Sequence, residues 1–151
     1  MNINKAYKFK QINDLISSSG TVMNVNLQSF SEQGYELVIN LLPDDSKHAT
    51  GNEKHLIESQ GIQYCHIAVD WDNPKSSDFE SFEAIMKASQ DKKIHIHCAA
   101  NYRATAFYGM FACKYFNWTK EQFNELTSEI WQLSEYPTWV KFVSDNTQIP
   151  I

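Results

Sequence analysis

The segment KKIHIHCAANYRATAF, residues 92–107, contains a predicted strand, a tight loop and the start of a predicted helix. Isoleucine and histidine alternate through residues 93–98, which is typical of a buried strand. From residue 104 to about 116 nearly every side chain is apolar or aromatic, which predicts a helix buried on most sides. Cys98 and Arg103 bracket the short loop between them. A strand that turns directly into a helix is the unit from which parallel sheets are built.

The alternation of strands and helices continues on both sides of this segment. Apolar, β-branched runs at 35–42 and 62–69 predict two more strands, and residues 52–61 predict a short helix between them. We therefore predict an α/β fold: a single domain, residues 1–151, with a mainly parallel central sheet flanked by helices. The remaining predicted elements are an edge strand at 21–25 and helices from Ser77, from Thr119 and over the tail 136–146.

Two of the predicted helices begin at a capping-box pattern. Ser77 is followed three residues later by Glu80, and Thr119 is followed three residues later by Gln122. In a capping box the hydroxyl and the longer side chain each satisfy one of the free N–H groups of the first turn. The two pairs therefore predict where these helices start.

Composition and charge limit the function classes. The chain has 42% hydrophobic and 21% charged residues, which is ordinary for a soluble globular protein. A net charge of -5 argues against nucleic acid or an anionic membrane as partner, so any anion site must be local. No apolar stretch approaches the roughly 20 residues of a membrane span. Three cysteines without metal-type spacing favour a reducing compartment, so we expect a cytoplasmic protein, or a periplasmic one if a secretion signal preceded the chain.

The loop after the third predicted strand has the chemistry of an anion site. A thiolate is the reactive form of cysteine, and a helix N-terminus and a nearby arginine both favour negative charge on Cys98. Arg103 supplies a planar fork for two oxygens of a phosphate, and Asn101 readily accepts the left-handed conformation that a tight cradle needs. The alternative is that Cys98 is a buried thiol at the end of a core strand. The predicted phosphate-binding residues are Cys98, Ala99, Ala100, Asn101, Tyr102 and Arg103.

The stretch VDWDNP, residues 69–74, is the second candidate for chemistry because it follows another predicted strand. A carboxylate at such a place can act first as a general acid and then as a general base. Asp70 is the first candidate for this role and Asp72 the second. Aspartate and asparagine are also ordinary turn formers, so a plain turn is the alternative.

The remaining histidines and cysteines have simpler interpretations. His95 and His97 point to the same face of the predicted strand, but the sequence offers no third ligand, so we interpret them as core histidines and predict no metal site. Cys65 or Cys113 could form a disulfide with Cys98 under oxidation, and the sequence does not give the distance.

Three segments resemble the cysteine-dependent phosphatases, whose signature is His-Cys, five residues and then Arg. They resemble most narrowly the small bacterial phosphatase-like family DUF442, which also occurs fused in beta-lactamase-hydrolase-like proteins. The segments are GYELVINLLPDD (34–45), GIQYCHIAVDW (61–71) and IHIHCAANYRATAF (94–107). The resemblance implies a dual-specificity-like, protein tyrosine phosphatase-like fold. It also implies hydrolysis of phosphate monoesters, of a protein or a small molecule, without a metal or organic cofactor.

The resemblance also implies roles for single residues. Cys98 would be the nucleophile that forms a phosphocysteine, Arg103 would bind the phosphoryl oxygens, and His97 would orient the loop. Asp70 stands four residues before Pro74, a spacing similar to that of the acid loop of tyrosine phosphatases, with Asp72 as the competitor. The implied catalytic residues are Cys98, Arg103, Asp70, Asp72, His97 and Thr105, whose hydroxyl would ease departure of the thiolate, and Tyr102 would stack on a substrate ring at the rim.

The loop departs from the phosphatase signature in three ways. Only four residues separate Cys98 from Arg103, Asn101 stands where a glycine is common, and Ala104 directly follows the arginine, which leaves Thr105 as the source of a hydroxyl. A loop with four intervening residues also resembles that of the rhodanese-like sulfurtransferases. Two alternatives to a phosphatase therefore stay open: a sulfurtransferase that carries a persulfide, and a non-catalytic pseudophosphatase that holds phosphate, sulfate or a phosphoprotein in the loop.

Overall fold

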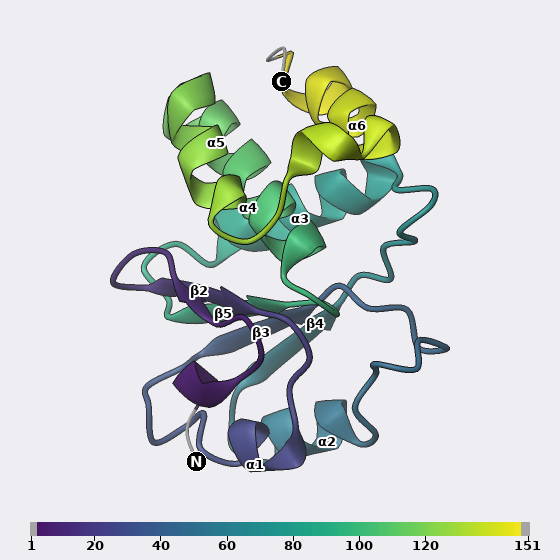
Figure 1. The fold of residues 1–151 in the computed structure, drawn as a ribbon. Helices are drawn as coiled ribbons and strands as arrows, with labels where there is room; N and C mark the ends of the chain where they lie inside the picture. Colours follow the sequence, from purple (N-terminus) through teal and green to yellow (C-terminus); the bar gives the residue numbers. More distant parts are fainter. Residues whose placement is uncertain (1–2, 149–151) are drawn as a thin grey trace.

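A five-stranded sheet forms the centre of the computed structural model (Figure 1). The structure describes residues 3–148, so the two ends of the predicted domain 1–151 lie outside the described residues. The strand order of the sheet is β1-β2-β5-β3-β4. The β1–β2 pair is antiparallel, and the β2–β5, β5–β3 and β3–β4 pairs are parallel. The predicted mainly parallel sheet is therefore confirmed. The strands are β1 (Lys10–Gln11), β2 (Ile16–Ser19), β3 (Leu37–Asn40), β4 (Gln63–His66) and β5 (Ile94–His97).

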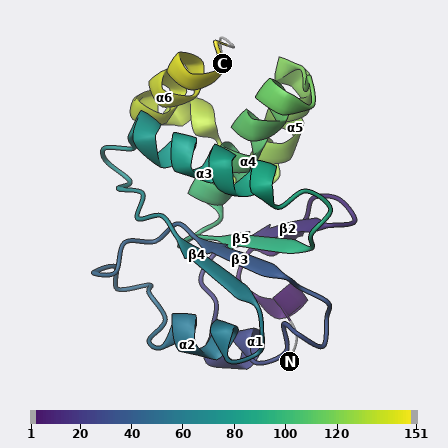
Figure 2. The same cartoon turned by 180° about the vertical axis from the view of Figure 1, so that it is seen from behind.

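Helices cover both faces of this sheet, as Figures 1 and 2 show. The short helices α1 and α2 lie on one face, and α3 to α6 lie on the other. Each face has its own apolar core, because successive strand residues point to opposite sides. Ile94 and Ile96 belong to the core under α3 to α6. The helices are α1 (Asn24–Leu27), α2 (Glu53–Glu58), α3 (Ser76–Ala88), α4 (Tyr102–Tyr115), α5 (Lys120–Ser128) and α6 (Pro137–Thr147), with short 3-10 turns at Ile3–Lys5 and Leu133–Glu135.

The predicted edge strand at 21–25 is wrong. The strand beside β5 is β2, which begins at Ile16 and continues through three serines, and residues 24–27 form α1 instead. Serine is a weak signal for a buried strand, but here two hydroxyls have a partner across the sheet. Ser17 Oγ lies 2.7 Å from His95 Nδ1, and Ser19 Oγ lies 2.8 Å from His95 Nε2. The hydrogen bonds compensate for burying polar side chains in β2.

One of the two predicted capping boxes is present. Thr119 and Gln122 exchange hydrogen bonds at the start of α5, at 2.8 and 3.1 Å. The Ser77–Glu80 pair is not a cap, because α3 begins earlier, at Ser76. There the carboxylate of Asp78 accepts the backbone N–H of Lys75 at 3.2 Å. Asp78 thus takes the role that the prediction gave to Glu80, because its carboxylate accepts the N–H of the cap residue.

The carboxyl ends of three parallel strands meet at one edge of the sheet. The backbone N–H of Leu41, after β3, donates to His97 O at 2.9 Å. The backbone N–H of Val69, after β4, donates to Leu41 O at 3.0 Å. The loops that leave β5, β3 and β4 therefore run side by side; Cys98 directly follows β5, and Asp70 directly follows Val69 in the loop after β4.

Candidate active site

The loop from Cys98 to Arg103 joins the end of β5 to the start of α4. Cys98 is 1% exposed and packs in the core under α3 to α6. Asn101 has φ 68° and ψ 5°, the left-handed conformation that the sequence predicted for it. Its amide nitrogen donates to Lys8 O at 2.8 Å, and the residue is fully buried. Asparagine therefore serves here as the turning residue, and its side chain fastens the loop to the N-terminal segment.

The end of β2 holds the other side of the loop. Cys98 N donates to Ser19 O at 3.2 Å, and Thr21 N donates to Ala99 O at 2.9 Å. Gly20 forms a bridge with Ala100. A side chain at Gly20 would lie 2.6 Å from Ala99 O, so only glycine lets the two backbones approach this closely. The loop is thus held by contacts across the sheet as well as by its own turn.

Replacing Gly20 with alanine is expected to lower the free energy of unfolding by about 1–3 kcal/mol. The new Cβ would meet Ala99 O at 2.6 Å and Tyr7 Cδ2 at 2.9 Å, and a backbone oxygen cannot swing aside. Urea denaturation measures the effect. Gly51→Ala is the matched control, since nothing lies within 4 Å of its Cβ position. Equal stabilities of the two variants would contradict the tight approach.

Arg103 links this loop to the segment after β4. It is the only arginine in the chain, since the other 12 of the 13 lysine and arginine residues are lysines. The residue is 8% exposed, its Nη1 donates to Val69 O at 2.8 Å, and its guanidinium lies 5.8 Å from the centre of the Trp71 ring. Within residues 3–148 no carboxylate pairs with it. Buried charges are normally paired, so this guanidinium is available to an anion.

Asp70 and Asp72 lie on the turn beside Arg103. Both are exposed, and Asp70 directly follows the residue whose carbonyl accepts from Arg103. The Oδ1 atom of Asp70 accepts the backbone N–H of Asp72 at 2.9 Å, so this carboxylate also shapes the turn. Arg103 thus ties the turn of Asp70 to the loop of Cys98. The structure brings the two predicted sites together. Asp70 is the neighbour of Val69, the residue that accepts from Arg103, whereas Asp72 lies two residues further along the turn.

Solved structures with the same arrangement of elements include a candidate phosphatase of the DUF442 family from Shewanella putrefaciens CN-32. It shares 32% sequence identity with a TM-score of 0.87, and the match covers 95% of this chain and 90% of that chain. The chain belongs to the DUF442 family. No family model and no curated protein matches the sequence itself.

More distant structures show that this DUF442 protein has the fold of the cysteine-based tyrosine phosphatases. TpbA of P. aeruginosa, in complex with phosphotyrosine, matches with a TM-score of 0.71 at 11% identity, over 90% of this chain and 82% of that one. The core catalytic domain of the PP-IP phosphatase SIW14 of S. cerevisiae, in complex with citrate, matches with a TM-score of 0.69 at 16% identity. That match covers 92% of this chain and 85% of that one. The predicted fold class is confirmed.

His97 of this DUF442 protein is held by a residue that the sequence did not single out. Its Nε2 lies 2.5 Å from Glu53 Oε2, and the two side chains are 1% and 3% exposed. Glu53 is the first residue of α2. The only local signal was an acidic residue in the first turn of the helix predicted at 52–61. The imidazole was predicted to orient the loop, and this carboxylate is its side-chain partner.

His95 is a core histidine, as interpreted. Both ring nitrogens contact serine hydroxyls of β2, and the ring is fully buried. Burial, and then the neighbouring His97, hold the pKa of His95 well below its usual value, so its ring is neutral. Among residues 3–148 no three His, Cys, Asp or Glu side chains gather as a metal site.

Thr105 and Tyr102 both contact Trp131, which lies between α5 and the 3-10 turn at Leu133–Glu135. The Thr105 hydroxyl donates to Asn101 O at 2.8 Å and accepts from Trp131 Nε1 at 3.2 Å. The Tyr102 ring stacks on Trp131, with centroids 4.7 Å apart and planes 10° apart. Trp131 thus covers one face of the tyrosine that was predicted to stack on a substrate. These contacts anchor the first turn of α4, and they leave the predicted roles of both residues as predictions.

All three cysteines are free thiols in the structure. Burial raises the pKa of the Cys113 thiol to about 11 and also raises that of Cys65. Both are therefore poor sources of thiolate near neutral pH. Cys98 differs because it belongs to the loop that leads into α4, three residues before the N-cap Asn101 and five before the only arginine, so it is the candidate nucleophile of the three.

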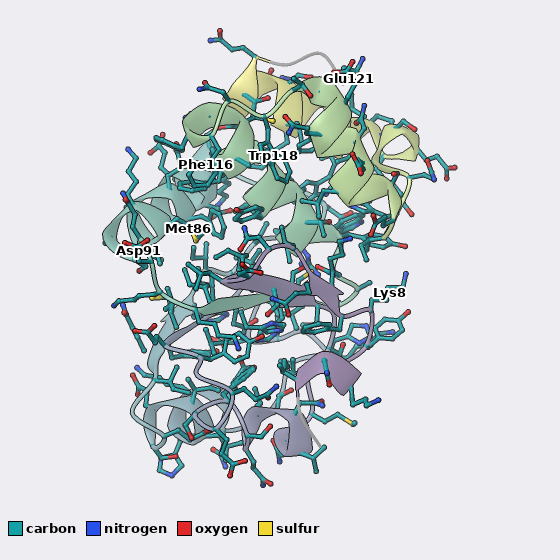
Figure 3. All side chains as sticks on the ribbon, turned by 90° about the vertical axis from the view of Figure 1, so that its left-hand side faces the viewer. Lys8, Met86, Asp91, Phe116, Trp118 and Glu121 are labelled. Atoms are coloured by element: carbon teal, nitrogen blue, oxygen red, sulfur yellow. The ribbon has the colours of Figure 1, made fainter. Side chains whose placement is uncertain are left out.

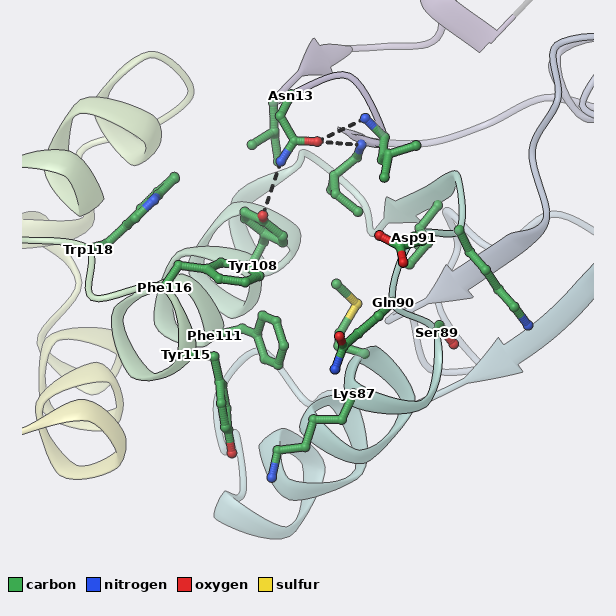
Figure 4. Close-up of a pocket in the computed structure, with 16 residues that line it drawn as sticks. Asn13, Lys87, Ser89, Gln90, Asp91, Tyr108, Phe111, Tyr115, Phe116 and Trp118 are labelled. Carbon is green, nitrogen blue, oxygen red and sulfur yellow. Dashed lines mark hydrogen bonds between the residues drawn. The ribbon is translucent and has the colours of Figure 1, made fainter.

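A pocket of about 620 Å³ lies at the opposite end of the sheet and does not belong to this site. Its lining includes Ile16 and Ile94, the first residues of β2 and β5, and none of residues 98–103. Figure 4 shows aromatic side chains on one side of it, where Asn13 donates to the hydroxyl of Tyr108 at 3.2 Å. Figure 3 shows the separation: Asp91 of the pocket lies on one side of the molecule, and Lys8, beside the loop, lies on the other. The volume of this pocket alone does not make it the active site, because the residues of the Cys98 loop do not line it.

Proposed function

We propose that the protein is a cysteine-dependent phosphatase that hydrolyses phosphate monoesters through a phosphocysteine on Cys98. Its structural neighbours are phosphatases of the tyrosine phosphatase-like type. The observation that carries the proposal is Arg103, a buried arginine without a carboxylate partner among residues 3–148, which stands in the first turn of α4, five positions after a buried cysteine. A guanidinium and the N–H groups of a helix start together form a site for a dianion.

In the proposed first step the Cys98 thiolate attacks phosphorus in line with the leaving oxygen. The S–P bond forms as the P–O bond breaks, and Asp70 gives a proton to the departing oxygen. Arg103 and the backbone N–H groups of the loop stabilise the charge on the equatorial oxygens. In the second step a water gives its proton to Asp70 and attacks phosphorus, which releases phosphate and regenerates the thiolate. Asp72 is the alternative acid, and Thr105 the proposed hydroxyl beside the leaving thiolate.

The proposed substrates are phosphorylated molecules with an accessible monoester, from a protein or a small metabolite. Two neighbours hold phosphotyrosine or citrate, so anionic ligands suit this fold. With a net charge of -5, the protein attracts an anion only through the local field of the loop. Inorganic phosphate or sulfate should bind there as well. None of the helices within residues 3–148 is long and apolar enough to cross a membrane.

The four-residue spacing between Cys98 and Arg103 supports a second candidate function. A shorter cradle offers fewer N–H groups, which suits a persulfide sulfur better than a phosphoryl group. The protein would then transfer sulfur from thiosulfate to cyanide, and Cys98 would carry the persulfide. A loop that binds phosphate without turnover is the third outcome, because Asp70 is already engaged in its own turn.

Turnover of an aryl phosphate, p-nitrophenyl phosphate, between about pH 4.5 and 8 tests the proposal. We expect phosphate release and, after acid quenching, a phosphorylated Cys98 peptide in the mass spectrum. A persulfide after thiosulfate treatment, without phosphate release, would indicate the sulfurtransferase. Phosphate that raises the midpoint of thermal unfolding without any turnover would indicate a binding module. Either result would overturn the phosphatase.

A further inference from the structure

Lys8 lies beside the loop that joins β5 to α4, in the N-terminal segment that leads into β1 (Figure 3). Its carbonyl accepts from Asn101 Nδ2 at 2.8 Å, so its backbone is tied to the turning residue of the loop. The carbonyl of the preceding Tyr7 accepts from Gly20 N at 2.8 Å, and Gly20 in turn forms a bridge with Ala100. These contacts fix the lysine at the edge of the candidate active site.

The backbone of Lys8 has φ 51°, in the left-handed region that residues with a Cβ adopt only at a cost in free energy. Glycine adopts this conformation freely, and asparagine adopts it more readily than lysine does. The turn by itself would therefore favour a smaller residue at this position. A residue held in such a conformation beside a candidate site directs attention to its side chain.

The ammonium group of Lys8 contacts aromatic rings and no acid. Its Nζ lies 5.1 Å from the centre of the Tyr102 ring and 5.7 Å from that of the Tyr7 ring. Within residues 3–148 no carboxylate pairs with it. A ring face attracts the positive charge, while the three N–H donors of the ammonium remain available to water or to an anion.

Lys8 and Arg103 differ in burial, and this difference separates their tasks. Arg103 is 8% exposed and is the proposed partner of a phosphate in the loop, whereas Lys8 is half-buried. Tyr102, over whose ring Lys8 Nζ lies, is the residue directly before Arg103. Because the chain has a net charge of -5, an unpaired cation at this rim gives a local positive field. The group that matches it is a negative charge further out on the same ligand.

We propose that Lys8 is a specificity-determining residue: its ammonium binds a second anionic group, a carboxylate or a phosphate, of a substrate whose phosphate monoester lies in the loop. The position of the monoester comes from the proposed function, on which this proposal rests. The favoured substrates are then phosphate monoesters that carry a further negative charge. Monoesters with an uncharged remainder would bind only through Arg103 and the N–H groups of the loop.

Two ligands that cannot be hydrolysed test this: benzylphosphonate and 4-carboxybenzylphosphonate, which differ by one carboxylate. Calorimetric titration measures both dissociation constants. We expect the wild type to bind the carboxylate ligand about five-fold more tightly, and Lys8→Met to bind the two ligands about equally. Lys8→Arg should keep the preference, and so should the matched control Lys5→Met, because Lys5 is an exposed lysine three residues earlier. A third ligand, 1,4-phenylenebis(methylphosphonate), shows whether a carboxylate or a phosphate-like group binds Lys8 more tightly.

Lys8→Gly covers the case in which Lys8→Met does not fold, because glycine suits a φ of 51° and also lacks the ammonium. In the wild type itself, the preference should shrink as the ionic strength rises from about 0.05 to 0.5 M, since salt screens a half-exposed ion pair.

Equal affinity of the wild type for benzylphosphonate and its carboxylate analogue would overturn the role of Lys8, and so would a failure of both to bind. A preference that survives in Lys8→Met or Lys8→Gly would overturn it as well. A preference that depends on Lys8, in a protein that does not hydrolyse p-nitrophenyl phosphate, would leave the role of Lys8 standing and reject only the phosphatase. Hydrolysis without such a preference would reject only the role of Lys8.

Discussion

The Cys98→Ser variant is expected to hydrolyse aryl phosphates at least about 10⁴-fold more slowly than the wild type. A serine hydroxyl does not ionise near neutral pH, so no strong nucleophile remains in the loop. The two side chains differ by one atom, and the site is 1% exposed, so the packing around residue 98 should change little. Steady-state turnover at saturating substrate measures the loss, and bound phosphate should still raise the midpoint of unfolding.

The other cysteines provide the control for this experiment. Cys113→Ser and Cys65→Ser should keep wild-type turnover, because both thiols have raised pKa values and lie outside the loop. Activity in Cys98→Ser within ten-fold of the wild type would contradict a phosphocysteine intermediate. It would point to a contaminating phosphatase or to a different nucleophile.

The Arg103→Lys variant is expected to lose about 10³-fold in kcat/KM. The guanidinium can donate to Val69 O through Nη1, as observed, while its other N–H groups face two oxygens of a bound phosphate. A lysine has a single point charge and cannot hold both partners. The variant should also lose most of the stabilisation that phosphate gives to the wild type in thermal unfolding.

The composition of the chain allows the same prediction to be tested without mutagenesis. Because Arg103 is the only arginine, an arginine-selective dicarbonyl such as butanedione modifies a single site. Modification should abolish turnover and be slowed by inorganic phosphate. Wild-type activity after complete modification, or in Arg103→Lys, would contradict the proposed role. Lys114→Arg serves as a control for the change of cation, since Lys114 pairs with Glu83 at 2.8 Å, away from the loop.

Local sequence was sufficient to predict the strands, turns and caps that depend on residues close together in the chain. The strands β3, β4 and β5 lie inside the runs 35–42, 62–69 and 93–98, although each is shorter than its run. The left-handed Asn101 and the cap at Thr119 also follow from short-range rules, because a turn or a cap satisfies its own backbone groups. The strand-to-helix junction at Cys98 was therefore visible in sixteen consecutive letters, 92–107.

The tertiary structure decided what the loop is attached to. The three serines of β2 gave no apolar signal, yet all three are buried. Two of them have partners far along the chain: His95 contacts Ser17 and Ser19 from 78 and 76 positions away, and the Tyr35 hydroxyl lies 2.6 Å from Ser17 Oγ. Arg103 meets Val69 across 34 positions, and His97 meets Glu53 across 44. Such pairs form because parallel strands bring the ends of distant segments to one edge of the sheet, and a buried polar group must find its partner there. No local pattern specifies that partner, so the sequence alone named the candidate nucleophile and the arginine but not the residues that hold them.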